Sequence, residues 1–364
     1  MADLPPLPAR PWLGIARGLA ILDAPPAPDT PRDVLCLSCR ASPCCWIAGL
    51  HELEPMTLAD LDRIRYWLGF DRLMVGVQRL GGWRLFYRQP CAHLDRATYL
   101  CGVHGTDDKP RVCQAFDPTG CHYRANLIGG RPGPDLVQLD LRRFQAVLER
   151  VEVDARGRIT SMPSWDEVRE VTAAIDIEEL RYPPPQQQPA DLDALRAPLD
   201  ARPAPARGAG LGAWDSPCQG CRAPCCEKVL VPMAAPSSAA AVDYLRYLLN
   251  FEGLEIGVAD TDTWLIVVHT RCRHFDADTR RCTVFGQPER PLVCAAYDPW
   301  SCDYPERFGP WQGSDILRLD RGDWPTLEAL LATDEDGRVL ARPDRQAVLD
   351  AMARSAEEDV VGAA

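Results

Sequence analysis

Residues 218–226 read Cys-Gln-Gly-Cys-Arg-Ala-Pro-Cys-Cys, and residues 36–45 read Cys-Leu-Ser-Cys-Arg-Ala-Ser-Pro-Cys-Cys. Each stretch has two cysteines separated by two residues and ends on two adjacent cysteines. From the adjacent pair onward, the next cysteines follow at steps of 46, 10, 12 and 8 residues in both parts of the chain, at a constant offset of 181 residues. Spacing that recurs at a fixed period is typical of duplicated structural units. The sequence therefore predicts a tandem duplication that is built around its cysteines.

All sixteen cysteines belong to this pattern. A buried cysteine often acts as a small hydrophobic residue, but that role does not explain eight positions that recur in register. We therefore expect every cysteine to bind metal. They are Cys36, Cys39, Cys44, Cys45, Cys91, Cys101, Cys113 and Cys121 in the first copy, and Cys218, Cys221, Cys225, Cys226, Cys272, Cys282, Cys294 and Cys302 in the second.

The two-residue gap between Cys218 and Cys221 favours metal binding, because one tight turn presents two thiolates to the same ion. Four such sulfurs complete a tetrahedral zinc site, and the same gap serves iron–sulfur clusters, so the spacing leaves both cofactors open. A redox-active dithiol is a third use of the gap, but no βαβ pattern precedes either copy. The adjacent cysteines indicate more than one metal atom, since neighbouring side chains on an extended chain point in opposite directions.

Composition predicts a globular protein with neither a membrane-spanning segment nor a nucleic-acid partner. The 364 residues are enough for two domains, and 46% hydrophobic and 25% charged residues lie in the usual range. No apolar run approaches the roughly 20 residues of a membrane span. The net charge of -12 disfavours nucleic acid, because phosphate binding needs clustered Lys and Arg side chains.

The first residues of the chain predict a cytoplasmic protein. Their best apolar stretch, residues 12–22, is interrupted by Arg17, whereas a signal peptide needs an unbroken apolar region and a cleavage site with small residues. In a reducing compartment, regular cysteine spacing is more often metal-binding than disulfide-forming. A secreted disulfide scaffold is the alternative, and an even number of cysteines in each copy is compatible with it.

Domain boundaries follow from the repeat and from a change of composition between its copies. Three consecutive prolines and three consecutive glutamines occur near the start of residues 183–210, which is linker composition. We expect a Pro-rich N-terminal segment at 1–32, the first cysteine-cluster domain at 33–182, the Pro/Gln/Ala-rich linker at 183–210, the second cysteine-cluster domain at 211–356 and a C-terminal tail at 357–364.

Each copy predicts a helix soon after its adjacent cysteines. Thr57 and Asp60 form a candidate capping box ahead of one apolar stripe, and Ser238 precedes a second stripe. The stripes consist of Leu58, Leu61, Ile64 and Leu68 in the first copy and of Val242, Leu245, Leu248 and Leu249 in the second.

Two short β-rich runs follow each predicted helix. They cover residues 73–77 and 83–87, with Gly81-Gly82 as a turn between them, and residues 257–259 and 264–268. A loop, a turn at 154–157 or 334–337 and a terminal helix at 164–175 or 344–352 complete each copy. The predicted fold class is α+β: two homologous small metal-organised domains with short helices, a short β-hairpin and cysteine-rich loops.

Other recurring residues are weaker candidates. His93 and His274 each lie two residues beyond a cysteine and could bind metal, but a supporting or packing role is more common at such positions. Turns and core packing are also the more common roles for Asp95, Asp276, Asp117, Asp298, Tyr123 and Tyr304. We expect Trp83 and Trp264 in the core, and surface or local contacts for the histidines without a counterpart, His51, His104, His122 and His269.

The cysteine pattern resembles that of a known family. Cys218-x2-Cys221-x3-Cys225-Cys226, followed by Cys272, Cys282, Arg290-Pro291, Cys294 and Cys302, is similar to the CxxCxxxCC cysteine-cluster family (YkgJ-like), a zinc- or iron-chelating domain. The first copy departs from the pattern by one extra residue before Cys44 and by Lys109-Pro110 in place of Arg-Pro. The resemblance implies metal binding, with iron–sulfur cofactors in relatives such as flagellin lysine methylases, and it implies no particular substrate.

The sequence thus predicts a cytosolic metal-binding protein that carries iron–sulfur or zinc centres in two tandem domains. Its expected role is electron transfer, or the cluster-bearing part of a modification enzyme. A zinc-stapled scaffold for protein interactions and a metal storage or delivery protein are the alternatives. The expected partners are metal ions and a protein or redox partner.

Overall fold

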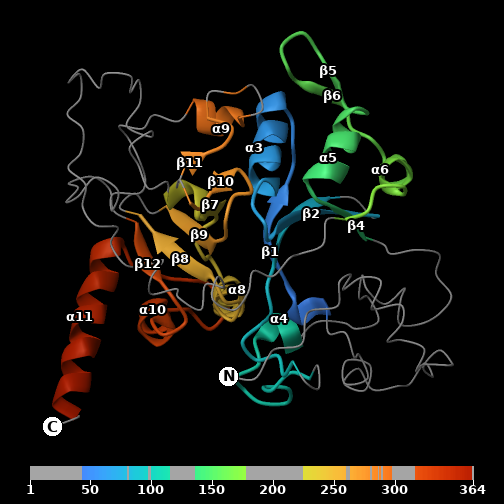
Figure 1. The fold of residues 1–364 in the computed structure, drawn as a ribbon. Helices are drawn as coiled ribbons and strands as arrows, with labels where there is room; N and C mark the ends of the chain where they lie inside the picture. Colours follow the sequence, from blue (N-terminus) through green and yellow to red (C-terminus); the bar gives the residue numbers. More distant parts are fainter. Residues whose placement is uncertain are drawn as a thin grey trace, which may run out of the picture. The chain divides into compact units, whose positions relative to one another are not determined.

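The computed structural model describes residues 43–79, 82–96, 100–114, 136–177, 224–259, 263–278, 281–285, 287, 290–296 and 316–362. These residues form two compact units (Figure 1). Their mixed α+β class agrees with the predicted fold class. Unit 1 comprises the described residues within Met1–Lys109, Ala115–Ala190 and Pro288–Ala296. Unit 2 comprises those within Pro110–Gln114, Asp191–Gln287 and Tyr297–Ala364. Each unit therefore includes a short segment from the other half of the sequence.

Unit 1 is built on a four-stranded antiparallel sheet. Its strands are β1 (Ile47–Leu53), β2 (Leu73–Gln78), β3 (Trp83–Arg88) and β4 (Leu136–Leu139), in the order β1-β3-β2-β4. The predicted hairpin is its centre, where Val75 pairs with Leu85. Gly82 makes the turn possible, because its φ of 92° is favourable only for glycine.

Helices cover one face of this sheet. They are α3 (Leu58–Leu68), α5 (Leu141–Leu148) and α6 (Trp165–Thr172), and α3 packs on β2 while α5 and α6 pack on β4. The small hairpin of β5 (Glu152–Val153) and β6 (Ile159–Ser161) lies between α5 and α6 in sequence. The short helix α9 (Leu292–Ala295) also belongs to this unit and packs against α3.

The start of α3 confirms the predicted capping box. The Thr57 hydroxyl accepts a hydrogen bond from the Asp60 amide, and the Asp60 carboxylate accepts one from the Thr57 amide over 3.0 Å. This exchange satisfies backbone donors that have no partner inside the helix. Leu61, Ile64 and Leu68 of the predicted stripe are buried, but Leu58 is 49% exposed, because it lies in the first turn, where the helix enters from the surface.

Unit 2 also has a four-stranded sheet, with the order β12-β8-β9-β7. Read from β7, this order corresponds to that of unit 1 read from β1. Its strands are β7 (Lys228–Met233), β8 (Leu254–Val258), β9 (Trp264–His269) and β12 (Leu317–Leu319), and all neighbours are antiparallel. Its helices are α8 (Ala239–Leu249), α10 (Trp324–Leu330), α11 (Arg345–Gly362) and the short α4 (Arg111–Gln114), which packs on α8.

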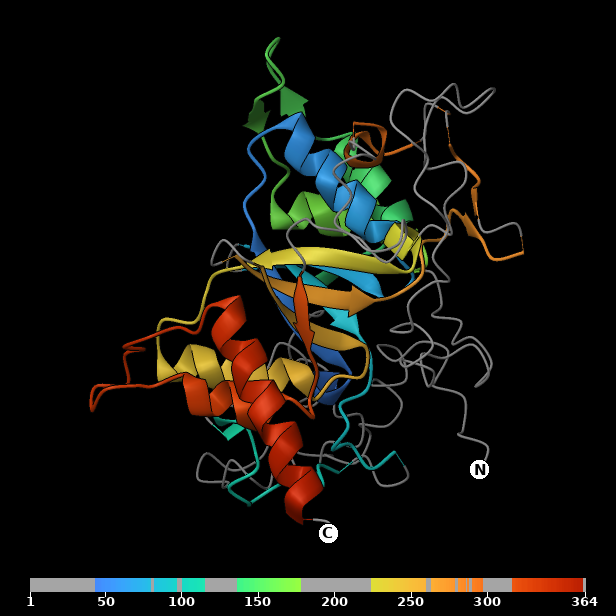
Figure 2. The same ribbon diagram turned by 90° about the vertical axis from the view of Figure 1, so that its left-hand side faces the viewer.

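The core of unit 2 lies between the sheet and three of these helices (Figure 2). Trp264 of β9 is 1% exposed and packs with Leu245 of α8, Leu327 of α10 and Val348 of α11. All four predicted stripe residues of α8 are buried, and Ser238 caps this helix through the Ala241 amide. The predicted core positions Trp83 and Trp264 are confirmed as buried.

Several elements differ from those predicted. A strand, β1 or β7, lies between the adjacent cysteines and the first helix of each half, and the hairpin is accordingly part of a larger sheet. Strand β8 begins at Leu254, three residues before the predicted start. Helices α5 and α10 occupy segments that were predicted to be loops.

The turns and terminal helices agree better with the prediction. Gly157 and Gly337 have φ values of 73° and 75°, and their amides close the turns onto Asp154 and Asp334. Helix α6 falls within its predicted range, whereas α11 continues ten residues beyond Met352. Among the described helices, none has the length and apolar character that a passage through a bilayer demands.

Candidate metal centre

The adjacent cysteines lie on a turn of 3-10 helix in both halves. These turns are η1 (Pro43–Cys45) and η7 (Pro224–Cys226), and a strand begins two residues after each. The thiols of Cys44 and Cys45 hydrogen-bond to each other, as do those of Cys225 and Cys226. The expectation that the two sulfurs point in opposite directions along an extended chain was therefore wrong, because the backbone is helical at this point.

A third cysteine of each half is fixed beside this turn by backbone hydrogen bonds. The Cys91 amide donates to the Cys45 carbonyl over 2.7 Å, and the Cys272 amide donates to the Cys226 carbonyl over 2.7 Å. Cys91 and Cys272 follow β3 and β9, so these bonds continue the pairing of β3 with β1 and of β9 with β7.

The fourth cysteine of each half is paired with a residue that lies three positions after the third cysteine. Cys101 forms an isolated bridge with Leu94, and Cys282 pairs with Phe275 in the two-stranded sheet of β10 (Phe275–Asp276) and β11 (Arg281–Cys282). The Leu94 and Phe275 amides donate to the Cys91 and Cys272 carbonyls over 3.0 Å. Backbone hydrogen bonds and strand pairing thus bring four cysteines of each half near one another.

The pKa values of these thiols reflect their proximity. The pKa of Cys45 is well above its usual range because of its hydrogen bond to Cys44, burial, and the charges of Cys44, Cys91 and Cys101. The pKa of Cys226 is raised for the corresponding reasons, by Cys225, burial, Cys272 and Cys282. Four neighbouring thiols cannot all become thiolates unless a cation offsets their repulsion, which is the condition that metal binding meets.

Lys109 adds a positive charge to the first cluster. The pKa of Cys44 is lowered chiefly by the hydrogen bond from Cys45, and Lys109 lowers it further. The Lys109 ammonium lies 3.2 Å from His104 Nδ1. The sequence identified Lys109 only as a departure from the Arg-Pro of the family pattern, with Arg290 as its counterpart, and did not predict its charge beside the cysteines.

A hydrophobic wall backs the first cluster. Cys45 and Cys91 pack against a buried group on the sheet face opposite the helices, which consists of Trp46, Ile47, Met74, Phe86, Leu94 and Leu136. Met74 and Phe86 are directly paired across β2 and β3. Apolar surroundings strengthen the interaction of thiolates with a metal cation, because little water competes there.

The corresponding sheet face of unit 2 is ionic instead. Glu255 and His269 are 2% and 1% exposed, and His269 Nε2 lies 3.1 Å from Glu255 Oε1. Arg318 Nε lies 3.9 Å from Glu255 Oε2, and buried Lys228 is paired with His269 in the sheet. The prediction of a surface or local contact for His269 was therefore wrong. His269 is the last residue of β9, and the strand is buried at this position.

The other candidate residues have separate positions. The carbonyls of His93 and His274 accept hydrogen bonds from Gly102 and Thr283. The Asp276 carboxylate accepts one from the Asp278 amide over 2.9 Å, which is the turn-forming role expected for it. His122, Asp117, Asp298, Tyr123 and Tyr304 lie outside the described residues.

The remaining cysteines are only partly within the described chain. Cys113 lies on α4 in unit 2 and Cys294 on α9 in unit 1. Cys36, Cys39, Cys121, Cys218, Cys221 and Cys302 lie outside the described residues. None of the ten cysteines that the structure describes forms a disulfide.

The donor chemistry of each cluster fits a thiophilic ion. Thiolate sulfur is the ligand that zinc and iron–sulfur clusters share. Across the described stretches of the chain, however, no three Cys, His, Asp or Glu side chains stand together with the spacing of a metal site. Backbone hydrogen bonds and strand pairing therefore account for the proximity of these cysteines.

Comparison with known proteins gives a match in the second half. Residues 217–312 match the CxxCxxCC family model, described as "Putative zinc- or iron-chelating domain". This match supports zinc or iron chelation by the segment that contains Cys225, Cys226, Cys272 and Cys282. None of the curated proteins and none of the solved structures compared with the chain matched it.

Proposed function

We propose that this protein holds a metal centre in each half, and that iron–sulfur clusters occupy these centres, with all sixteen cysteines as ligands. Its role would be electron transfer, or the cluster-bearing part of a modification enzyme, in the cytoplasm. The observation that carries the proposal is the grouping of Cys225, Cys226, Cys272 and Cys282 within the segment that matches a zinc- or iron-chelating family.

Tandem duplication is part of this proposal. The orders β1-β3-β2-β4 and β7-β9-β8-β12 correspond strand by strand, with antiparallel neighbours in both sheets. The 2.7 Å bond between Cys91 and Cys45 also has its counterpart between Cys272 and Cys226. Two homologous domains, at 33–182 and 211–356, would account for both correspondences and for the repeated cysteine spacing.

The number and grouping of thiols favour a cluster over a single zinc ion. A tetrahedral zinc site uses four sulfurs, whereas each half has eight cysteines. In each half the hydrogen-bonded adjacent cysteines place two sulfurs side by side on one turn. Such a pair suits a cofactor with several metal atoms, since each sulfur can bind a different atom of one cluster.

The deciding experiment is chemical analysis of the full-length protein purified without oxygen. Iron and acid-labile sulfide in equal amounts, with visible absorption that reduction bleaches, are expected. Zinc without sulfide and without colour would contradict the cluster and make the centres structural. If iron and sulfide are found, measurement of the reduction potential and tests of electron donors would identify the redox partner.

Loss of metal binding on substitution would test the ligands. Cys226→Ser should remove metal from the second centre, and Cys45→Ser should remove it from the first. The two variants are matched controls, because each leaves the other half intact. Metal content at the wild-type level in both variants would contradict the assignment of these cysteines.

A further inference from the structure

Two buried aspartates occupy equivalent positions on the first long helix of each half. Asp62 on α3 and Asp243 on α8 are each 8% exposed, and they are 181 residues apart in sequence, which is the offset of the cysteine pattern. Burial of a carboxylate is unfavourable unless partners replace its water shell. The partners of these two carboxylates therefore indicate why they are placed there.

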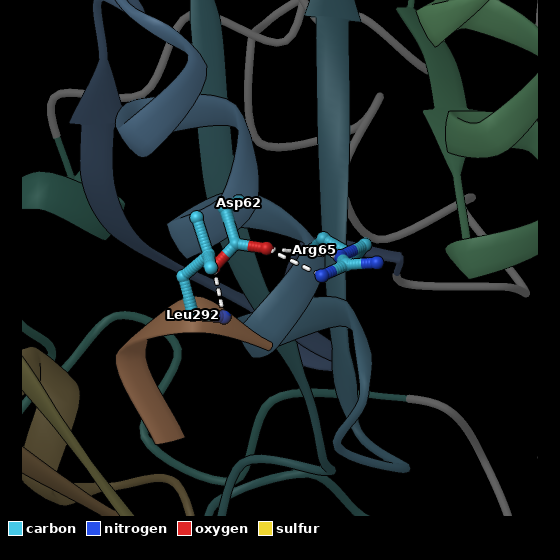
Figure 3. Close-up of polar contacts among 3 residues, drawn as sticks. All are labelled: Asp62, Arg65 and Leu292. Carbon is cyan, nitrogen blue, oxygen red and sulfur yellow. Dashed lines mark hydrogen bonds and ion pairs between the residues drawn. The ribbon is translucent and has the colours of Figure 1, made fainter. Parts of the chain in front are cut away.

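The two carboxylates accept hydrogen bonds from the same kinds of donor. Asp62 Oδ1 accepts from Arg65 Nη2 over 2.5 Å, and Asp62 Oδ2 accepts from the Leu292 amide over 2.6 Å (Figure 3). Asp243 Oδ1 accepts from Arg246 Nη2 over 2.6 Å, and Asp243 Oδ2 accepts from the Val112 amide over 3.2 Å. One oxygen thus binds an arginine of its own helix, and the other binds a backbone amide of a distant segment.

These amides belong to the first turns of the short helices α9 and α4. The first amides of a helix have no partner within it and need an external acceptor. Pro291, at the N-cap of α9, provides no side-chain hydrogen bond. Asp62 supplies the missing acceptor, and its negative charge at this end of the helix is also favourable. The amide at the start of α4 receives the same cap from Asp243.

The two short helices carry cysteines of the repeated pattern. Cys294 lies on α9, and its amide donates to the Pro291 carbonyl over 3.0 Å. Cys113 lies on α4, and its amide donates to the Pro110 carbonyl over 2.9 Å. Fixing the first turn of either helix therefore fixes the backbone of its cysteine.

The two contacts are crossed with respect to the sequence. Asp62 of the first half binds α9 of the second half, 230 residues away, and Asp243 of the second half binds α4 of the first, 131 residues away. Packing agrees with these bonds, since α9 contacts α3 within unit 1 and α4 contacts α8 within unit 2. The exchange is thus reciprocal, and it is made by corresponding residues.

We propose that Asp62 and Asp243 are positioning residues, each of which holds the cysteine-bearing helix of the opposite sequence half. The position of Cys294 then depends on Asp62, and that of Cys113 depends on Asp243. The consequence for metal binding rests on the proposed function, because it requires that these two cysteines are ligands.

Hydrogen exchange and thiol alkylation of the full-length protein test the crossed dependence directly. Asp62→Ala should speed amide exchange in residues 290–296 and alkylation of Cys294 by about fivefold, the factor that corresponds to the loss of a helix cap. Residues 110–114 and Cys113 should stay at their wild-type rates. Asp243→Ala should give the reverse pattern, so each variant is the control for the other.

The proposal is overturned if Asp62→Ala leaves α9 at its wild-type rates, or if it affects α4 as much as α9. If Asp62→Ala does not fold, Asp62→Asn replaces it. The Asn amide oxygen can still accept from the Leu292 amide, but the negative charge is lost, so exchange of residues 290–296 should be faster than in the wild type by less than about fivefold. Wild-type rates in this variant would overturn the proposal. Rescue by Asn to rates between those of the wild type and Ala is expected where both variants fold.

Metal analysis of the same samples separates this proposal from the proposed function. In a metal-containing wild type, Asp62→Ala should shift the visible spectrum and Asp62→Asn should restore it in part. An unchanged spectrum together with faster exchange of α9 would contradict a role in positioning a ligand. Protein without metal would contradict the proposed function, while the exchange rates would still decide whether the aspartates hold the helices.

Discussion

Gly76 of β2 faces the ring of Phe86 on β3 so closely that a Cβ atom at this position would lie 2.5 Å from Phe86 Cε2. The added Cβ atom would also lie 2.6 Å from Leu136 Cδ1. Phe86 and Leu136 belong to the hydrophobic wall behind Cys45 and Cys91. Phe86 and Leu136 can therefore pack over Gly76 only because this residue has no side chain.

We predict that Gly76→Ala destabilises the protein by about 1–3 kcal/mol, the usual range for overpacking of a core. Denaturant unfolding would measure the change. Gly102→Ala is the matched control, because its Cβ would have only the His93 carbonyl oxygen nearby, at 3.4 Å. Equal stabilities of the two variants would show that the wall behind the cysteines adapts without cost.

The buried ionic group of unit 2 leads to a second prediction. Glu255→Met should destabilise the protein by roughly 3 kcal/mol, because it removes the carboxylate partner of the buried His269 and of the partly exposed Arg318. Met74→Leu on the matching strand of unit 1 is the control, and its similar volume should keep the change below about 1.5 kcal/mol. A Glu255→Met variant as stable as the wild type would argue against a stabilising role of the ionic contacts.

The helix caps give a third prediction. Thr57→Ala and Ser238→Ala should each lower the free energy of unfolding by about 1 kcal/mol, through loss of the bond to the Asp60 or Ala241 amide. Thr57→Ser keeps the hydroxyl and should remain close to the wild type. A loss with Thr57→Ser as large as with Thr57→Ala would show that the methyl group, and not the cap, matters.

Metal removal is the fourth prediction. Complete chelation should increase hydrogen exchange in residues 91–104 and 272–285, because ligand loops gain their order from the metal. The pairing of β2 with β3 and of β8 with β9 should stay protected, since their buried apolar residues do not depend on metal. Unchanged exchange, proteolysis and melting after chelation would contradict metal-dependent order in the loops.

Local signals in the sequence were sufficient for some elements. The Thr57 and Asp60 capping box and the stripe that follows it predicted α3, and the apolar runs around Gly82 predicted β2 and β3. The turns at Gly157 and Gly337 were likewise predictable, because a positive φ there needs glycine. In each case the deciding interaction lies within a few residues of the chain.

Other elements depend on partners that the sequence does not identify. Strand β7 contains Pro232 and has no alternating pattern, because it lies at the edge of a sheet whose register is set by β9. The adjacent cysteines adopt a turn of 3-10 helix, and its three residues are too few to show a helical period in the sequence. Asp62 was not among the candidate residues, because its partner Leu292 is distant in sequence.

The candidate site was predictable in its chemistry and partly in its grouping. The repeated spacing identified the cysteines, and the structure brings Cys45, Cys91 and Cys101 close enough to affect one another electrostatically. The cysteine spacing could not reveal that Cys113 and Cys294 lie on helices held by the opposite sequence half. A recurring Asp and Arg three residues apart, at the offset of the cysteines, was the available signal.

The contact between Asp62 and Leu292 also constrains the order of folding. Contacts between residues far apart in the chain form late, because a long loop must close first, and the first half leaves the ribosome before the second. Helix α3 can therefore form and pack early, but the neighbour that covers Asp62 arrives only after about 230 further residues have been synthesised. During this interval a carboxylate that is buried in the final structure is hydrated, so unit 1 cannot be completed before residues 290–296 have been synthesised.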